Sequence, residues 1–421
     1  MRPAEKAILV GLGLPGRSAN RWDMEDSVGE LSQLAKTAGA HVVHTSMSRR
    51  TEPNSPYFIG SGKVQEIKQV CILQKANLVI FDDELSPAQS RNLQNTLGLK
   101  VLDRTELILD IFARRARTRE GQLQIEMAQL NYLLPRLAGA WTHLSRQEGG
   151  IGTRGPGEKQ LEIDRRRVRE KISRLRGDLE SVRQHRSTQR KRRHRTEIPV
   201  VAIIGYTNAG KSTLMNALTH AGVLVEDKLF ATLDPTTRNV TLPNKRQFFL
   251  TDTVGFIKKL PHSLVDAFKA TLEEVSDADL LLHVIDASSS TMEGQVQAVE
   301  EVLREIGAHE RPILPVLNKS DLLDPGNGHR IPRSLDGAVA ISAKTGAGVP
   351  ELMKAIEEMF NAMMVPVQLV VPQSEPKVIA QLLSHGHVLD MRYVDNKVRL
   401  RVELPPAMMH EFKRFVGSDL P

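Results

Sequence analysis

The first 112 residues alternate short apolar runs with segments whose apolar residues recur at helical spacing. Continuous apolar runs are typical of buried strands in a parallel sheet, so the pattern predicts a small parallel α/β unit over residues 1–112. Helices are expected to begin at Asp26 or Ser27, and at Ser86 ahead of Pro87. The expected strands are AILVGLGLP (7–15), HVVHTSM (41–47), LVIFDD (78–83) and KVLDR (100–104).

Residues 113–195 carry a different pattern, in which apolar residues recur at steps compatible with a heptad. Such residues form a stripe along a helix, and two stripes separated by a glycine-rich stretch predict a long antiparallel helical hairpin. Pro135 lies within the first stripe, where a proline can kink the helix. The basic run 189–195 has no stripe, so we expect it to fray into a linker. The stripes are Leu123, Met127, Leu130, Leu134 and Leu137, then Leu161, Val168, Ile172, Leu175, Leu179 and Val182.

The alternation of buried strands and helices resumes in a second α/β unit over residues 196–365, which is of domain size. Residues 366–421 predict a small α+β C-terminal unit with a helix, two strands and a last helix. The chain is therefore expected to be a multidomain α/β protein. The strongest strand runs of the second unit are VVAIIG (200–205), FFLTDT (248–253), LLLHVID (280–286) and ILPVLN (313–318).

The run GYTNAGKS (205–212) matches G-x-x-x-x-G-K-S, in which a glycine-rich loop binds phosphates through backbone N–H groups. It follows a strand-like run and precedes a helix-like one, which is the context that a P-loop requires. Lys211 is expected to reach the β- and γ-phosphates, and Ser212 to ligate Mg²⁺. A second run, FIGSGK (58–63), lacks Ser or Thr after its lysine and predicts only a loop that enters a helix.

Two further runs are expected to respond to the γ-phosphate. In DTVG, the Asp252 carboxylate can hold Mg²⁺ through water, and the Gly255 amide can contact the γ-phosphate. Between the P-loop and DTVG lies FATLDPTTR, a candidate mobile switch loop in which Thr232 is the chosen second hydroxyl for Mg²⁺. The rival hydroxyls of that loop, which stay open, are Thr236 and Thr237.

The base-recognition motifs favour guanine. In NKSD, the Asp321 carboxylate can accept hydrogen bonds from both N1–H and the exocyclic amine of guanine, a donor pair that adenine lacks. Asn318 and Lys319 are expected to brace the base and the loop, and SAK (342–344) can offer backbone N–H to the guanine O6. The motifs together predict a Ras-like P-loop GTPase domain over residues 196–365.

The residues expected to catalyse hydrolysis or to bind the nucleotide all belong to these motifs. Catalytic roles are expected for Lys211, Thr232 and Gly255. The residues expected to bind GTP or GDP are Gly205, Tyr206, Thr207, Asn208, Ala209, Gly210, Lys211, Ser212, Thr213, Phe230, Ala231, Thr232, Leu233, Asp234, Asp252, Thr253, Val254, Gly255, Asn318, Lys319, Ser320, Asp321, Ser342, Ala343 and Lys344.

Two residues bear on the hydrolysis mechanism. Phe256 follows DTVG, where Ras-like GTPases carry the glutamine that orients the attacking water. Either another group completes the site and intrinsic hydrolysis is slow, or Phe256 simply packs while a backbone group or a partner positions the water. Asn208 occupies a position that resembles that of potassium-stimulated GTPases, and we hypothesise that its side-chain carbonyl helps to hold K⁺ near the phosphates.

The positive charge is concentrated in one segment. From Arg165 to Arg195 there are 14 Lys and Arg residues and three acids, whereas the whole chain has a net charge of only +7. This imbalance favours binding of a polyanion such as RNA over an ordinary solvated helix. The glycine-rich GGIGTRGPG (149–157) lacks a Gly-Lys-Ser ending, so we interpret it as the hairpin tip and not as a nucleotide cradle. The expected RNA contacts are Arg154, Arg165, Arg166, Arg167 and Arg169.

The composition excludes several classes of protein. A single cysteine, Cys71, excludes an internal disulfide framework, and no apolar run reaches the roughly 18 residues that a membrane span needs. The sequence has no Cys/His metal spacing and no Ser/His/Asp nucleophile arrangement. We expect a monomeric cytoplasmic protein.

With these motifs in place, the chain resembles the HflX family of translational GTPases over nearly its whole length. The resemblance implies a two-part N-terminal domain, a GTPase domain and a short C-terminal domain. It also implies binding to the large ribosomal subunit and, as in bacterial members, the splitting of stalled ribosomes under stress. The runs that carry it are YFIGSGK (57–63), LSPAQSRNLQ (85–94), DRTELILDIFARRART (103–118), GGIGTRGPGE (149–158), GYTNAGKST (205–213) and FATLDPTTR (230–238).

Two other functions stay open. One is a GTPase that acts in assembly of the large subunit, which the motifs do not separate from splitting. The other is an RNA-binding or RNA-remodelling protein in which nucleotide serves only as a regulatory ligand. An ATP-driven helicase is disfavoured, because Asp321 does not suit adenine.

Overall fold

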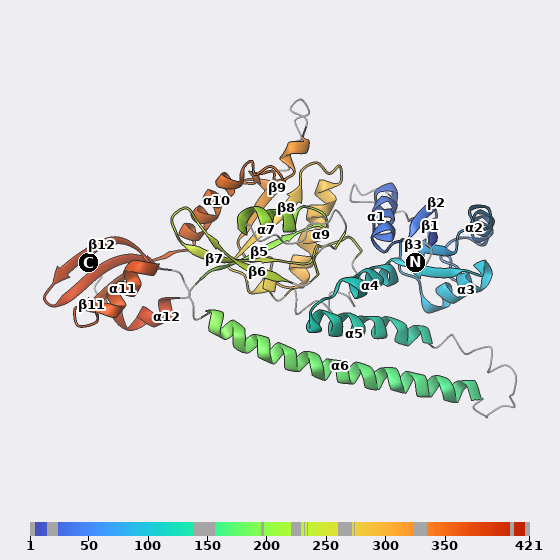
Figure 1. The fold of residues 1–421 in the computed structure, drawn as a ribbon, viewed down its shortest axis with the longest axis horizontal. Helices are drawn as coiled ribbons and strands as arrows, with labels where there is room; N and C mark the ends of the chain where they lie inside the picture. The colour runs from blue at the N-terminus through green and yellow to red at the C-terminus, as the bar shows by residue number, and fades with distance from the viewer. Residues whose placement is uncertain are drawn as a thin grey trace.

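The structure is a computed structural model, and its described units follow one another along an elongated molecule (Figure 1). Residues 149–155 of the expected hairpin tip, with Arg154, lie outside the described residues, as do Ala231 and Asp234, whereas Pro156 and Gly157 of the expected tip are helical. The described residues are 5–14, 24–137, 156–194, 198–219, 229–230, 232–233, 235–259, 272, 274–323, 335–404 and 408–416.

The N-terminal unit is built on a four-stranded parallel sheet with strand order β2-β1-β3-β4. Every residue of β3 is buried, as the continuous apolar runs predict for a sheet covered on both faces. The strands are β1 (Lys6–Gly13), β2 (His41–Arg49), β3 (Leu78–Phe81) and β4 (Lys100–Asp103). The helices are α1 (Met24–Thr37), α2 (Ser61–Gln74), α3 (Pro87–Leu97) and α4 (Arg104–Arg115).

The predicted helix starts differ in outcome. The Ser86 start is confirmed, because its side chain accepts a hydrogen bond from the Gln89 amide while the Gln89 side chain accepts one from the Ser86 amide. The start at Asp26 or Ser27 is wrong, because α1 is already helical at Met24. Asp26 instead lies in the first turn, where a carboxylate interacts favourably with the helix dipole.

The helical hairpin consists of α5 (Arg119–Arg136) and α6 (Pro156–His194), which lie side by side (Figure 1). Leu123 of α5 packs in one cluster with Leu175 and Leu179 of α6. The Lys171 ammonium lies 2.5 Å from the Glu126 carboxylate, so positions advance along α5 as they recede along α6. The two helices are therefore antiparallel, as the two stripes predict.

The prediction of a frayed linker at residues 189–195 is wrong for most of that run. Helix α6 continues to His194, although this end has no apolar stripe. Arg, Lys and Gln have high helix propensity and can extend a helix that is already nucleated. Pro135 lies inside α5 without ending it before Arg136, and Pro156 occupies the first position of α6, where its missing N–H costs nothing.

The central unit is a six-stranded sheet with strand order β10-β9-β8-β5-β7-β6, in which β6 alone of the paired strands runs antiparallel to its neighbour. Its strands are β5 (Val200–Gly205), β6 (Thr236–Thr241), β7 (Gln247–Asp252), β8 (Leu280–Asp286), β9 (Ile313–Asn318) and β10 (Val339–Ala340). Its helices are α7 (Lys211–Thr219), α9 (Met292–Glu305) and α10 (Val349–Ala362), with a 3-10 turn η2 (Ser320–Leu322).

The C-terminal unit is a three-stranded antiparallel sheet with helices, and it has one strand more than the sequence predicts. The additional strand β11 begins and ends near prolines, Pro366 and Pro372, which a strand tolerates at the edge of a sheet. The elements are β11 (Val365–Pro372), α11 (Pro376–His385), β12 (His387–Val394), β13 (Lys397–Leu404), α12 (Met409–Phe412) and η5 (Lys413–Phe415).

The N-terminal and central units share one hydrophobic core. Phe112 of α4 and Phe230 of the central unit are both buried, and their rings meet edge to face with centroids 4.6 Å apart. The same core includes Tyr206, Val254 and Phe256 of the central unit. The two units are therefore packed directly against each other rather than joined only by the chain.

We predict that Leu175→Ala detaches α6 from α5. The substitution removes a buried side chain that contacts Leu123 and Leu179, at an expected cost of about 2–5 kcal/mol. Hydrogen exchange should show faster amide exchange over residues 162–182. Ile163→Ala on the same helix is the matched control, because Ile163 is 45% exposed whereas Leu175 is buried. Equal exchange in the two variants would contradict the proposed packing.

Candidate functional site

The loop between β5 and α7 has the conformation that the glycines of GYTNAGKS permit. Gly205 has a φ of +149°, and a Cβ there would lie 2.2 Å from the Val284 carbonyl oxygen. Gly210 has a φ of +96°, and its Cβ would lie 2.1 Å from the Asn318 side-chain nitrogen. Both positions therefore exclude any larger residue, and the loop leads into the N-terminus of α7, where backbone N–H groups can bind an anion.

Lys211 is buried beneath this loop. Its ammonium donates hydrogen bonds to the carbonyl oxygens of Gly205 and Tyr206, at 3.1 and 2.8 Å. Burial lowers the pKa of Lys211 to about 8, although the nearby Asp252 carboxylate acts in the opposite direction. The side chain is therefore a buried cation whose charge is sensitive to pH just above neutrality.

Three predicted magnesium groups come together beside Lys211. The Ser212 hydroxyl lies 2.7 Å from the Thr232 hydroxyl, and the two hydroxyls donate to the same Asp252 oxygen at 2.8 and 3.0 Å. The other Asp252 oxygen is buried and has no hydrogen-bond partner among the described residues. Burial raises the pKa of Asp252, against the effect of Lys211. Two hydroxyls and a partly unsatisfied carboxylate form a donor set that suits Mg²⁺.

The rival threonines have other surroundings. Thr236 and Thr237 belong to β6, where they pair in register with Asp252 and Thr251 of β7. The Thr237 hydroxyl lies 3.0 Å from the Thr251 hydroxyl. The structure thus places Thr232, and neither rival, in hydrogen-bond contact with Ser212.

The predicted base-binding loops are tied to the phosphate loop by Asn318. Its side chain donates to the Ala209 carbonyl at 2.8 Å and accepts from the Ala343 amide at 2.9 Å. The Ser342 hydroxyl donates to the Asp321 carboxylate at 2.6 Å, which orients that exposed side chain. NKSD, SAK and the P-loop therefore converge on one location.

Sequence reasoning missed Asp286. This residue ends β8, and its carboxylate lies 2.7 Å from the Lys319 ammonium while it also accepts from the Ser288 hydroxyl at 2.6 Å. Lys319 has a positive φ of 65°, so the ion pair helps to hold a strained loop. The available signal was the charged ending of LLLHVID, a buried strand that stops beside the other motifs.

The backbone after DTVG is paired with the phosphate loop. The Phe256 carbonyl accepts from the Thr207 amide at 2.8 Å, and the Phe256 amide donates to the Gly205 carbonyl at 3.1 Å. A Cβ on Gly255 would lie 2.9 Å from Thr207 and 3.0 Å from the Lys211 ammonium. The Phe256 side chain is buried in the shared core, so this residue packs.

The other expected contacts vary in exposure. Thr207, Ala209, Phe230, Leu233, Thr253 and Val254 are buried, and the Thr253 hydroxyl donates to the Ile203 carbonyl at 2.6 Å. Asn208 is exposed with a φ of 62°, and Lys344 is exposed on the SAK loop. Thr213 and Ser320 are half-buried.

The expected RNA contacts on α6 are largely in solvent. The Arg166 and Arg167 side chains are 80% and 74% exposed. Arg169 is exposed and Arg165 is half-buried. Arg166 lies 2.8 Å from Glu170, one turn further along the helix. Exposed pairs of this kind are weak, so these arginines can exchange an intramolecular partner for a phosphate.

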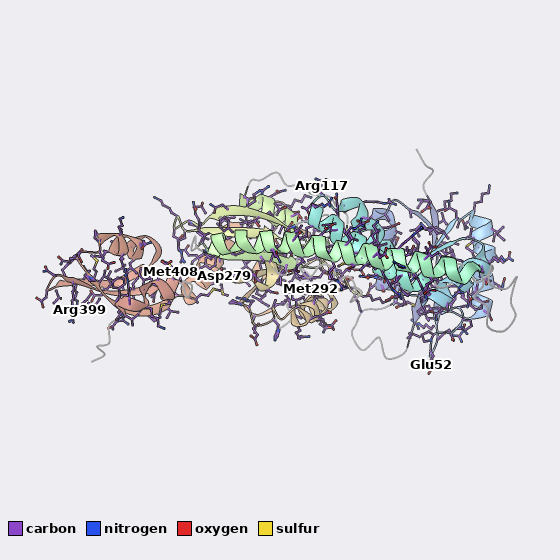
Figure 2. All side chains as sticks on the ribbon, turned by 90° about the horizontal axis from the view of Figure 1, so that it is seen from below. Glu52, Arg117, Asp279, Met292, Arg399 and Met408 are labelled. Atoms are coloured by element: carbon purple, nitrogen blue, oxygen red, sulfur yellow. The ribbon has the colours of Figure 1, made fainter. Side chains whose placement is uncertain are left out.

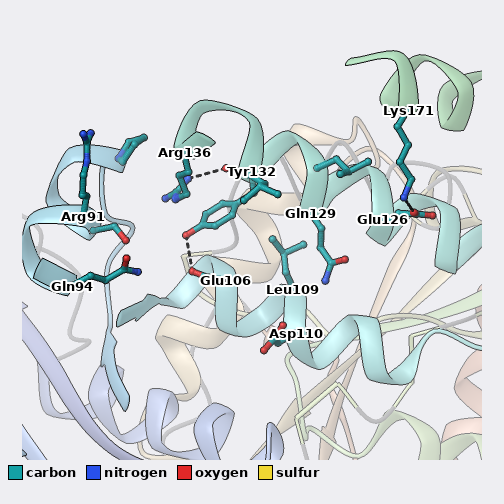
Figure 3. Close-up of a pocket in the computed structure, with 14 residues that line it drawn as sticks. Arg91, Gln94, Glu106, Leu109, Asp110, Glu126, Gln129, Tyr132, Arg136 and Lys171 are labelled. Atoms are coloured by element: carbon teal, nitrogen blue, oxygen red, sulfur yellow. Dashed lines mark hydrogen bonds and ion pairs between the residues drawn. The ribbon is translucent and has the colours of Figure 1, made fainter. Parts of the chain in front are cut away.

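A separate cavity of about 540 Å³ lies between the N-terminal unit and the hairpin (Figure 3). Tyr132 points toward Glu106, with 3.5 Å between the hydroxyl and the carboxylate, and Arg136 stacks on the Tyr132 ring (Figure 3). Burial, together with the Asp103 charge, raises the pKa of Glu106 to about 7. None of the predicted GTP contacts lines this cavity, so it is distinct from the nucleotide site.

No helix in the described part of the chain is long and apolar enough to cross a membrane. Within the same residues, no group of three or more His, Cys, Asp or Glu side chains could hold a metal ion. The hydroxyl-rich set around Asp252 is a different kind of donor set, which depends on phosphate oxygens to complete it.

We predict that triphosphate binding weakens as pH rises through the pKa of Lys211. The charged ammonium binds phosphate, so raising the pH from about 7 to about 8.5 should lower affinity about fourfold. Bound phosphates favour the charged form, and the protein should therefore take up a proton on binding near pH 8. Calorimetry in buffers of different ionisation enthalpy measures this uptake. Lys354→Ala, which changes an exposed lysine, should not alter it; binding without proton uptake would refute the assignment.

Three family models match the chain in succession. The model of the GTP-binding GTPase N-terminal region matches residues 25–113, and that of the GTP-binding GTPase middle region matches residues 115–193. The model described as 50S ribosome-binding GTPase matches residues 200–319.

Among solved structures, the complex of SsGBP with GDP has 28% sequence identity and a TM-score of 0.48, covering 84% of this chain and 98% of that chain. A GTP-binding protein from the archaeon Sulfolobus solfataricus in complex with GDP has 27% identity, the same coverage and a TM-score of 0.44.

Curated relatives align with nearly the whole chain. GTPase HflX of Caldanaerobacter subterraneus subsp. tengcongensis is 47% identical over 418 residues, which cover 99% of this chain and 95% of the relative. GTPase HflX of Escherichia coli K12 is 45% identical over 405 residues, which cover 95% of this chain and 94% of the relative. The chain therefore belongs to the HflX GTPase family and is a P-loop GTPase that hydrolyses GTP.

Proposed function

We propose that this GTPase binds the large ribosomal subunit in its GTP form, splits or rescues stalled ribosomes, and leaves after GTP hydrolysis. The observation that carries the proposal is helix α6, whose 39 residues present arginines to solvent beside a unit that holds the GTPase motifs. The match to the family described as 50S ribosome-binding GTPase supports the same partner.

The nucleotide contacts are assigned from the geometry of the loops. Lys211 and the P-loop amides bind the phosphates, and Ser212 and Thr232 would ligate Mg²⁺ directly while Asp252 would hold it through water. Mg²⁺, when bound, neutralises charge on the β- and γ-phosphates. The Asp321 carboxylate, oriented by Ser342, accepts the two donors of the guanine edge.

Phe256 cannot orient the attacking water, because its side chain is apolar and buried in the shared core. The backbone amide of Gly255, directly before it, is the group of this segment that we expect to contact the γ-phosphate. We infer that K⁺ supplies additional positive charge beside the phosphates, with Asn208 as a ligand from the P-loop. The exposed side chain and left-handed backbone of Asn208 support this assignment.

The arginines of α6 contact ribosomal RNA in this proposal. RNA backbone phosphates attract clustered Arg and Lys, and the affinity of such an interface falls steeply with salt. Helix α6 crosses the molecule from the N-terminal unit toward the C-terminal unit and is not covered from below (Figure 2). Arg154 of the expected tip would extend the same interface.

We predict that K⁺ accelerates GTP hydrolysis at least about tenfold relative to an equal concentration of Na⁺, as expected for added charge at a phosphoryl-transfer site. Single-turnover hydrolysis in the two salts measures the ratio. Asn208→Ala should abolish it, whereas Asn239→Ala, an exposed asparagine on β6, should preserve it. Equal rates in K⁺ and Na⁺ would remove K⁺ from the mechanism.

We predict that Arg169→Glu weakens binding to large subunits and reduces the slope of log affinity against log salt by about 0.7–0.9. Co-sedimentation with a non-hydrolysable GTP analogue measures binding, and GDP should abolish it. The control is Lys354→Glu on α10, which changes an exposed charge away from α6. If both variants bind equally poorly, the effect is one of net charge and α6 is not the interface.

Adding the wild-type chain to intact ribosomes distinguishes a function in splitting from one in assembly. Light scattering of intact ribosomes should fall when GTP and the wild-type chain are added, because the particles separate into subunits. Undiminished scattering, together with binding to free large subunits, would instead favour a function in assembly.

A further inference from the structure

The Tyr206 side chain leaves the phosphate loop and enters the boundary with the N-terminal unit. Only 4% of the residue is exposed. Its hydroxyl donates to the Glu30 carboxylate of α1 and accepts from the Lys258 amide at 2.8 Å. Burial and the Glu30 charge raise the pKa of Tyr206 well above that of a free phenol, so the proton stays on the hydroxyl. One hydroxyl thus joins the phosphate loop, the segment after DTVG and the N-terminal unit.

Arg104, at the start of α4, holds Glu30 in place. Its guanidinium is 2% exposed, pairs with Glu30, and lies 2.8 Å from the Asp82 carboxylate. It also donates to the Lys258 carbonyl at 3.1 Å. The Lys258 amide and carbonyl are therefore both bound, the first by Tyr206 and the second by Arg104.

Lys259 completes this boundary cluster, which consists of Glu30, Asp82, Asp83, Arg104, Tyr206 and Lys259. The Lys259 ammonium lies 2.5 Å from Asp82 and 2.9 Å from Asp83, and the Ser27 hydroxyl donates to Asp82 at 2.6 Å. Burying so many charges is costly, and ion pairs of this kind give little net stability. Their geometry does, however, restrict how the two units can sit against each other.

The cluster lies next to the groups that contact the γ-phosphate in the assigned site. Lys258 follows Gly255 by three residues, and Phe256 between them is paired through its backbone with Gly205 and Thr207. The segment after DTVG is thus attached to the phosphate loop twice, once by backbone bonds and once by the Tyr206 hydroxyl. Because Phe256 replaces the usual glutamine, the position of this backbone has greater weight in placing the attacking water.

We propose that Tyr206 is a positioning residue for GTP hydrolysis, held by Glu30 and Arg104, through which the N-terminal unit sets the position of Gly255 relative to the phosphate loop. The side chain acts through the backbone, because its hydroxyl is directed into the boundary and is bound there by Glu30 and the Lys258 amide. The inference concerns hydrolysis by the chain alone, so it does not rest on the proposed action on ribosomes.

The test is a double-mutant cycle on hydrolysis without ribosomes. Tyr206→Phe and Glu30→Gln should each lower the single-turnover rate about tenfold, because small displacements of positioned groups are costly to catalysis. GTP and GDP affinity should change less than about twofold, since phosphate and base contacts remain. The double variant should be no slower than either single variant, because both substitutions break one interaction.

The matched control is Tyr132→Phe, which removes another largely buried phenol hydroxyl of the same chain, away from the phosphate loop. Its rate should equal that of the wild type. Three results would overturn the proposal: an unchanged or faster rate in Tyr206→Phe, additive losses in the double variant, or a loss of nucleotide affinity that matches the loss of rate. Glu30→Gln keeps the size of the side chain but removes the charge that binds the Tyr206 hydroxyl and Arg104, so it tests the link even where Tyr206→Phe folds poorly.

Discussion

The parallel order of the central sheet is the constraint on which the nucleotide site depends. Strands β5, β7, β8 and β9 run in one direction, so Gly205, Asp252, Asp286 and Asn318 all arrive at the same edge. Loops that follow these strand ends lie close together because the strands are neighbours, which is why ligands bind at this edge in open α/β sheets. Side chains then lock the loops together: Asn318 ties the phosphate loop to SAK, and Asp286 holds Lys319. The glycines allow the close approach that this requires.

Local patterns were sufficient to predict the parts of the structure that depend on local physics. The continuous apolar runs predicted the strands of the N-terminal sheet and β5, β7, β8 and β9 of the central sheet, because burial on two faces leaves no room for alternation, but they did not predict β6 or β10. Ser86 ahead of Pro87 predicted a capped helix start, and the stripes around Leu123 and Leu175 predicted the antiparallel hairpin. Motif spacing located the P-loop and NKSD and favoured Thr232, although it could not exclude Thr236 and Thr237. That choice depends on whether a hydroxyl faces Ser212 or lies in the β6–β7 ladder, which is a tertiary fact.

The unpredicted features result from contacts between distant parts of the chain or from weak local signals. Nothing in the spacing of Glu30, Arg104 and Tyr206 indicates that they meet, since a hydrogen bond across 176 residues and an ion pair across 74 residues leave no periodic trace. The role of Asp286 was missed for the same reason. The packing of Phe256 into a core shared by two units was also left open. The end of α6, from residue 189, is predicted as a linker because helix propensity without an apolar stripe is a weak signal. Strand β11 was not predicted because it has a proline near each end. The sheet tolerates these prolines because β11 is an edge strand.

Helix α6 also has a mechanical consequence. Its 39 residues, at about 1.5 Å each, give a rod roughly 58 Å long. The leucine contacts with α5 lie around Leu175, near the middle of the rod, and roughly 29 Å of helix extends on each side of this point. A rotation of only about 5° would move each end by about 2.5 Å, in opposite directions. Because α4 joins the hairpin to the boundary with the central unit, small adjustments beside the phosphates can become displacements large enough to make or break contacts at both ends of the rod.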